Sequence, residues 1–218
     1  MRKLFVLMAV MLAVSTPALA GLVNGDWGTG DETGWTRWAA PWGASNYAVT
    51  VGGPTPPEGT ASLNQGQAGS FGWFQTIAVP VGLKATVFAD WEGLIGGTGW
   101  AEVMFWTQAV PGGEGNRADV GAAADIAFKK DSWGMNPPTT WGWQPANASP
   151  HPGGNFGTVF SQGFVVVALK LGSSPGPGAP THTSWDNIRV DYVPEPGSLL
   201  ALATGLIGFV GLRRMRRR

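Results

Sequence analysis

The stretch that decides the fold class is Trp185-Asp186-Asn187-Ile188-Arg189-Val190-Asp191-Tyr192. Its apolar and polar side chains alternate, with Ile188, Val190 and Tyr192 set against Asn187, Arg189 and Asp191. A period of two is typical of a β-strand that has one buried and one solvated face. We therefore expect a strand over Thr183–Tyr192, in a sheet with one face turned to water.

A second stretch, Phe164–Leu171, begins Phe-Val-Val-Val-Ala-Leu and is apolar at both parities, which suits a central strand of a sandwich. Other short runs rich in Val, Phe, Trp and Thr are separated by Gly, Pro, Asn and Asp, and no long amphipathic helix interrupts them. The remaining expected strands are Tyr47–Val51, Gly72–Val79, Lys84–Trp91, Trp100–Thr107, Ile126–Lys129 and Thr158–Phe160. Expected loops are Pro54–Gly59, Pro111–Asn116, Trp133–Gly154 and Gly172–Pro180. This pattern predicts an all-β domain, an antiparallel β-sandwich of jelly-roll type over residues 21–193.

The two ends of the chain predict export. Residues 1–20 contain Arg2 and Lys3, an apolar run over Leu4–Val14 and the small-residue site Ala18-Leu19-Ala20. These are the three parts of a secretory signal peptide, here an N-terminal signal helix to be cut by signal peptidase after Ala20.

At the other end, Gly197–Leu212 is a 16-residue stretch without charge. As a helix it measures about 24 Å, enough to cross a slightly thinned bilayer as a C-terminal transmembrane helix. The basic residues that follow would stay on the cytoplasmic side and stop transfer: Arg213, Arg214, Arg216, Arg217 and Arg218.

Residues 194–218, preceded by Val193, resemble the PEP-CTERM sorting signal of Gram-negative bacteria. The matching parts are Val193-Pro194-Glu195-Pro196, the apolar helix from about Leu199 to Leu212, and the closing arginines. The resemblance implies cleavage near the Pro-Glu-Pro motif by an exosortase. It also implies an inner-membrane intermediate, delivery to the envelope or exterior, and association with exopolysaccharide and biofilm systems.

The whole chain has 14 Lys+Arg and 14 Asp+Glu, but this neutrality is a sum over unlike parts. Residues 21–193 hold 7 basic and 13 acidic residues, a net charge of −6. An acidic domain has no attraction for phosphates, so nucleic acid is not an expected partner. The absence of Cys excludes a disulfide scaffold and thiolate metal sites.

A further resemblance links the two edges of the domain. Asn24-Gly25-Asp26-Trp27 with Gly34-Trp35, and Trp185–Val190 at the other edge, are similar to the opening and closing motifs of galactose-binding-like or carbohydrate-binding-module-like jelly rolls. In that family the first and last strands meet and often hold a structural calcium. The resemblance implies Asp26 and Asp186 as the carboxylate ligands, although Gly28 stands where the usual Glu would be. The alternative is that Asp26 starts a turn and Asp186 ends a strand.

All twelve Trp lie between Trp27 and Trp185. Flat indoles stack on sugar rings, so Trp133, Trp141 and Trp143, in an expected loop, are the candidate glycan-binding residues. A second group is Trp35, Trp38 and Trp42, and the alternative for both groups is that they anchor loops or fill the core. Trp73, Trp91, Trp100 and Trp106 fall in expected strands and are assigned to the core.

The sequence offers little for catalysis. Only two His are present, His151 and His182, and common nucleophile, zinc and phosphate motifs are absent. A glycosidase pair could be drawn only from Asp90, Glu92 and Glu102. We therefore expect an exported, non-catalytic protein that binds polysaccharide or matrix. The alternatives are a purely structural envelope protein and a polysaccharide-active hydrolase.

Overall fold

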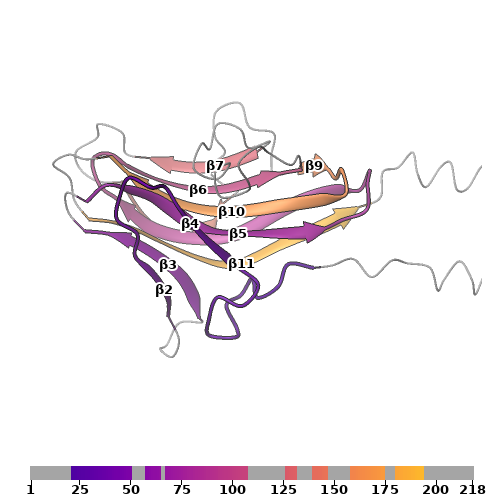
Figure 1. Ribbon diagram of the computed structural model, residues 1–218, viewed down its shortest axis with the longest axis horizontal. Coiled ribbons are helices and arrows are strands. Elements are labelled where there is room, and N and C mark those ends of the chain that lie inside the picture. The colour runs from indigo at the N-terminus through magenta and orange to yellow at the C-terminus, as the bar shows by residue number, and fades with distance from the viewer. Residues whose placement is uncertain are drawn as a thin grey trace, which may run out of the picture.

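The computed structural model describes residues 21–50, 57–64, 67–107, 126–131, 139–146, 158–174 and 180–193. Within these ranges the chain forms two antiparallel sheets packed face to face (Figure 1). The first sheet has the order β1-β4-β10-β6-β7, and the second has the order β2-β3-β11-β5-β8, with β9 added on β5. The predicted all-β antiparallel sandwich is therefore confirmed.

The five strands of the first sheet are β1 (Thr36–Ala39), β4 (Gly69–Ala78), β10 (Phe164–Ser173), β6 (Gly99–Trp106) and β7 (Ile126–Asp131). The second sheet contains β2 (Tyr47–Thr50), β3 (Glu58–Leu63), β11 (Thr181–Val193), β5 (Lys84–Ile95), β8 (Thr139–Pro145) and β9 (Thr158–Phe160). All eight predicted strands are present. Three were not predicted: β1, β3 and β8.

The loop prediction for Trp133–Gly154 is wrong over Thr139–Pro145, which forms β8 along the edge of β5. Likewise Glu58 and Gly59, placed in a loop, begin β3. The expected signal helix, the sorting tail and the loop 111–116 lie outside the described residues. Among the described residues, no helix is long and apolar enough to cross a membrane.

β11 shows the alternation that its sequence predicts, because Ile188 and Val190 are buried while Asn187 and Arg189 are exposed. Trp185, three residues before Ile188, is also buried. Side chains three apart on a regular strand point to opposite faces. A register shift between Asp186 and Arg189, with Asn187 at φ 50°, turns the side chains of Trp185 and Ile188 into the core.

Aromatic side chains build one end of the core where the two edge motifs meet. The Ile188 amide donates to the Gly25 carbonyl at 2.8 Å, so the opening segment lies against the last strand as the jelly-roll resemblance implies. Trp27 stacks on Trp35 at 5.4 Å between ring centroids and meets Trp73 edge-on at 5.2 Å. These buried rings fix the entry of the chain into the sandwich.

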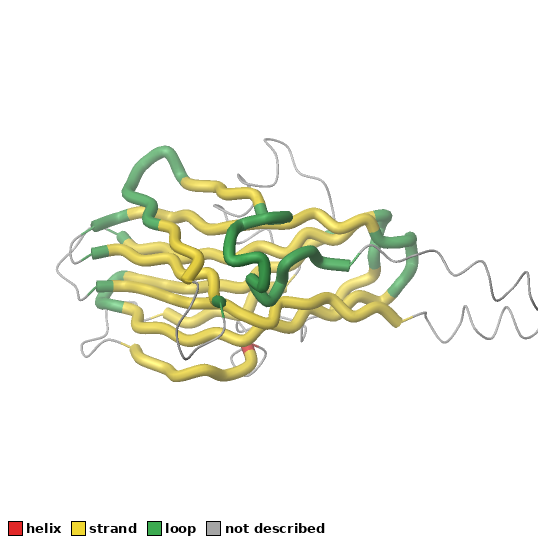
Figure 2. Tube along the Cα trace, turned by 90° about the horizontal axis from the view of Figure 1, so that it is seen from below, coloured by secondary structure: helices red, strands yellow, loops and turns green. Residues whose placement is uncertain are grey.

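Figure 2 shows the sandwich from a perpendicular direction, with turns at both of its ends and a further loop segment across the middle of the strands. The turn before β5 lies at the same end as the last residue of β11, since Val193 pairs with Lys84. Leu63, at the end of β3, pairs with Thr181 and so lies at the opposite end.

Candidate functional site on the outer face of the five-stranded sheet

The outward face of the first sheet departs from the usual rule that such a face is polar. The two central strands, β10 and β6, are buried on both sides. A second buried cluster, separate from the core between the sheets, lies on this face: Trp38, Met104, Trp106, Val166 and Ala168, with Phe74 and Phe164 packed against it. The outer side of this sheet therefore carries a layer of apolar side chains that is shielded from solvent.

One row of side chains crosses all five strands at the centre of this face. Backbone register places Trp38 opposite Gly72, Gly72 opposite Lys170, Lys170 opposite Glu102, and Glu102 opposite Lys129. Neighbouring side chains in such a row lie about 5 Å apart at Cβ. Gly72 has no side chain, and the Lys170 ammonium approaches the Trp38 ring across it. We refer to Trp38, Trp100, Glu102 and Lys170 as the outer-face cluster.

Gly172 gives Trp100 its position in this cluster. The two residues are opposite one another on β10 and β6, and a Cβ added to Gly172 would lie 2.2 Å from the Trp100 ring. The indole therefore lies against the backbone of the neighbouring strand. A partly exposed aromatic ring fixed in position on a sheet is a suitable platform for the C–H face of a sugar.

A buried ion pair occupies the centre of the cluster. The Lys170 Nζ lies 3.7 Å from Glu102 Oε2, and both side chains are almost fully shielded from solvent. The same ammonium lies 5.9 Å from the ring centroid of Trp38 and 5.8 Å from that of Trp100. Both distances suit cation–π attraction, so the charge is held between two indoles.

Glu102 Oε2 has no hydrogen-bond partner, although it is buried. A buried acceptor without a donor costs free energy until one is supplied. A hydroxyl group of a ligand could supply that donor. The cluster thus combines an acceptor, a cation and two aromatic rings. Trp38, Lys170 and Glu102 lie in the central row, and Trp100 lies in the next row on the same face.

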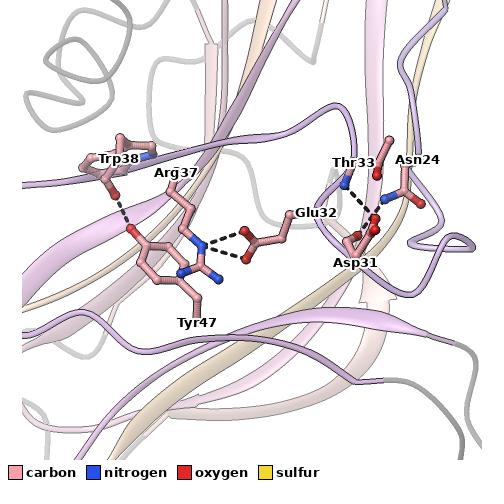
Figure 3. A network of polar contacts seen from close by, with 7 residues as sticks. All are labelled: Asn24, Asp31, Glu32, Thr33, Arg37, Trp38 and Tyr47. Carbon is pink, nitrogen blue, oxygen red and sulfur yellow. Dashed lines mark hydrogen bonds and ion pairs between the residues drawn. The ribbon is translucent and has the colours of Figure 1, made fainter.

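The polar network in Figure 3 holds Trp38 in place from the N-terminal side. The Tyr47 hydroxyl donates to the Trp38 carbonyl oxygen. Arg37 donates through Nε to Glu32 at 2.6 and 2.9 Å, and its guanidinium lies 4.6 Å from the centre of the Tyr47 ring. The hydrogen bond to Glu32 raises the pKa of Arg37, and burial raises the pKa of Tyr47 to about 12.

The turn before β1 is held by its own polar residues. The Asp31 carboxylate accepts from the Thr33 amide at 2.9 Å and from the Thr29 hydroxyl at 2.7 Å. Bonds from the Thr33 and Thr29 side chains lower the pKa of Asp31. Asn24 donates to the Asp31 carbonyl at 2.8 Å, which ties the opening motif to the turn that precedes β1.

The structure separates the candidate glycan-binding residues of the sequence. Trp141 is buried on the core side of β8. Its ring meets Trp91 edge-on, with 5.4 Å between the ring centroids, and the Lys130 ammonium lies 5.6 Å from the centroid of the Trp141 ring. Trp143 is exposed and lies at the irregularity in the β5–β8 pairing opposite Glu92. Trp133 lies outside the described residues.

The second tryptophan group also divides, because Trp35 and Trp38 are buried and Trp42 is 46% exposed. The core assignment is confirmed for Trp73 and Trp91, which lie between the sheets. It is also confirmed for Trp106, which is fully buried in the second hydrophobic cluster, on the outer side of the first sheet. It is wrong for Trp100, which is a partly exposed member of the outer-face cluster. The inward parity of β6 belongs to Ala101, Val103 and Phe105.

Lys170 was missed by sequence reasoning. It is the charged residue of β10, whose other residues are mostly apolar on both faces of the strand. The register that pairs it with Glu102 is not visible in the sequence.

The two calcium candidates lie in the region where the opening and closing motifs meet. Asp186 is buried and accepts from the Asn187 amide at 2.6 Å, whereas Asp26 is exposed and accepts from the Gly28 amide at 3.1 Å. Burial raises the pKa of Asp186, and the nearby carboxylates of Asp26 and Asp90 raise it further. The described residues contain no group of three or more His, Asp or Glu side chains arranged to hold a metal ion.

The carboxylates considered for hydrolysis lie on two different faces. Asp90 and Glu92 point outward from β5 in the second sheet, whereas Glu102 points outward from β6 in the first. About 10 Å of packed core separates the two sheets, so Glu102 cannot act on one bond together with either of the others. His182 lies on β11, and His151 is outside the described residues.

Comparison with protein families matches residues 193–218 to the PEP-CTERM protein-sorting motif. The chain therefore carries an exosortase sorting signal at its C-terminus, which implies export and sorting to the cell envelope. No curated protein sequence matches the chain.

Several solved structures are similar to the chain at low sequence identity. TmCBM61, solved with β-1,4-galactotriose, has 12% identity and a TM-score of 0.43, over 78% of this chain and 96% of that chain. A CBM4 structure has 15% identity and a TM-score of 0.43, over 79% and 99%. A family 11 carbohydrate-binding module from Clostridium thermocellum, solved with a β-1,3-1,4-mixed-linked tetrasaccharide, has 12% identity and a TM-score of 0.43, over 79% and 96%. The saccharides named here are ligands of those modules.

Proposed function

We propose that the chain is an exported, non-catalytic protein of the cell envelope or extracellular matrix whose sandwich binds polysaccharide through the outer-face cluster. The observation that carries this proposal is the buried Glu102 Oε2, which lacks a hydrogen-bond donor beside two indoles and an ammonium. Sugars offer what the cluster lacks, namely hydroxyl donors on a ring with an apolar face.

The accessible part of this site is its margin. Trp38 and Lys170 are buried, whereas Trp100 and Phe74 are only partly covered. A polysaccharide would stack on Trp100 at this margin, and the side chains that cover Glu102 Oε2 would have to shift before one of its hydroxyls could donate to that atom. Neutral glycans suit the site because the ion pair already balances the two charges in its centre.

Affinity electrophoresis and calorimetry with galactan, β-1,4-glucan and mixed-linkage β-glucan test the proposal. Trp100→Ala removes the platform and Glu102→Gln changes the acceptor. Loss of one stacking ring should weaken binding roughly tenfold. Trp143→Ala is the matched control, because Trp143 is the exposed tryptophan of the other sheet. Retained affinity in Trp100→Ala together with lost affinity in Trp143→Ala would move the site to β8.

A structural role in the envelope is the second candidate. Eight tryptophans of the described residues are buried: Trp27, Trp35, Trp38, Trp73, Trp91, Trp106, Trp141 and Trp185. If these rings serve stability alone, the protein binds none of the polysaccharides and the Trp100→Ala variant changes only its melting temperature.

Incubation of the protein with the same polysaccharides tests hydrolysis, for which turnover abolished by Glu102→Gln would be the supporting result.

A further inference from the structure

Two exposed apolar side chains lie at the end of the sandwich from which the C-terminal segment leaves. Val81 is 76% exposed and Phe160 is 52% exposed. Backbone pairing joins Phe160 to Lys84 and Lys84 to Val193, the last residue of β11. We call Pro80, Val81, Lys84 and Phe160 the apolar tip.

The tip is held in a fixed shape by backbone bonds around Ser161. The Ser161 amide donates to the Leu83 carbonyl at 2.9 Å, and its hydroxyl donates to the Val79 carbonyl at 2.9 Å. The Gly82 amide donates to the Ser161 carbonyl at 2.8 Å, and the Val79 amide to the Gly163 carbonyl at 3.1 Å. The turn that carries Val81 is therefore braced against the segment that directly follows Phe160.

Chain length places this surface close to a membrane in the unprocessed protein. The sorting motif begins at Val193, and the apolar stretch expected to span the bilayer begins at about Leu199. Six steps of extended chain reach at most about 20 Å. The opposite end, near Leu63, is about 40 Å further along β11.

The charge of the tip also suits a lipid surface. Residues 79–84 and 160–164 contain no Asp or Glu, and Lys84 is exposed among them. This contrasts with residues 21–193 as a whole, where 13 acidic residues outnumber 7 basic ones. Anionic lipid headgroups repel carboxylates and attract a lysine beside the apolar residues that enter the interface.

We propose that the apolar tip rests on the outer leaflet of the inner membrane until the sorting tail is cut. The contact orients the sandwich with its Val193 end down, so that the Pro-Glu-Pro segment is held at the membrane surface where a membrane transpeptidase works. The inference rests on the expected span at Leu199–Leu212 and does not depend on polysaccharide binding.

The full chain reconstituted in anionic nanodiscs tests this contact. Because the chain has no Cys, Val81→Cys and Phe160→Cys each accept a single environment-sensitive fluorophore. Asn64→Cys, exposed at the far end, is the matched control. We expect blue-shifted emission at Val81 and Phe160, quenched by headgroup spin-labelled lipid, and water-like emission without quenching at Asn64.

Water-like emission at all three positions would overturn the proposal. A blue shift that rises with the number of chains per disc but is not quenched by the spin-labelled lipid would show contact with a second copy, which also overturns it. Val81→Asp combined with the label at Phe160 checks the apolar nature of the contact, because the added carboxylate should abolish the quenching. Polysaccharide affinity in the Val81→Asp chain should equal that of the wild type, which separates this inference from the proposed function.

Discussion

Gly59 is the position where a single methyl group should reveal how tightly the aromatic core is packed. A Cβ at residue 59 would lie 2.2 Å from Cζ2 and 2.5 Å from Cε2 of the Trp27 ring, against ordinary contacts of 3.4–4 Å. Trp27 is fully buried and is confined by Trp35 at 5.4 Å and Trp73 at 5.2 Å. These two rings limit the directions in which Trp27 could move away from residue 59.

The expected cost of Gly59→Ala follows from this confinement. Overpacking a closed core costs about 1–3 kcal/mol, and the clash of more than 1 Å places this case at the upper end. Alanine also lowers the conformational entropy of the unfolded chain, which stabilises the fold by about 0.4–1 kcal/mol. The net destabilisation is therefore about 2 kcal/mol. For a domain of this size the melting temperature should fall by roughly 4–8 °C.

Thermal unfolding followed by tryptophan fluorescence and circular dichroism measures this difference. Gly142→Ala on β8 is the matched control, because a Cβ there meets nothing within 4 Å. That variant should melt at the wild-type temperature or slightly above it. If Gly59→Ala melts within about 1 °C of Gly142→Ala, the packing described around Trp27 is wrong.

Three further perturbations address the charged groups. Lys170→Met should lower the free energy of unfolding in urea by about 3–5 kcal/mol, since it removes the ion-pair partner of the buried Glu102 carboxylate. Adding Glu102→Gln should recover part of this loss, and no recovery would argue against a stabilising Lys170–Glu102 ion pair. Burial raises the pKa of Asp186 above 3.8, so its stabilising contribution is complete below about pH 3.8 and is lost as pH rises through the higher folded-state pKa. Asp186→Asn should therefore raise the melting temperature at pH 7 in calcium-free buffer and have a smaller effect near pH 4; an equal effect at both values would contradict this. A calcium ion held by Asp26 and Asp186 predicts that EDTA lowers the melting temperature of the wild type but not of Asp186→Asn, whereas melting curves unchanged by EDTA or added calcium would rule that ion out.

The strands that could be predicted are those whose own residues carry a strong pattern. Phe164–Leu171 is apolar throughout, and Ile188-Arg189-Val190 alternates, so both appear in the sequence before any partner is known. β8 reads Thr-Thr-Trp-Gly-Trp-Gln-Pro and lies between Pro- and Gly-rich stretches, which favour a loop. It is a strand because the edge of β5 offers it a hydrogen-bonding partner, and that edge is a property of the assembled sheet.

The site was less predictable than the fold because it depends on register between distant strands. Trp100 and Lys170 are 70 residues apart, and only the pairing of β6 with β10 brings them to one face. The number of tryptophans indicated aromatic surfaces, but exposure separates Trp143 from Trp141 only two residues away. The bulge between Trp91 and Gly93 in the β5–β8 pairing accounts for this, and nothing local in the sequence marks it.

The sorting signal required no fold to be recognised, because its parts occur in order within residues 193–218. The proposed function of the exported domain depends on the outer face of the five-stranded sheet. The most direct measurement is calorimetric titration of purified protein with soluble galactan and β-glucans, comparing the wild type with Trp100→Ala and Trp143→Ala. Binding by the wild type and Trp143→Ala, weakened roughly tenfold in Trp100→Ala, is the predicted result. Equal binding by all three proteins, or loss only in Trp143→Ala, would contradict a polysaccharide site at the outer-face cluster.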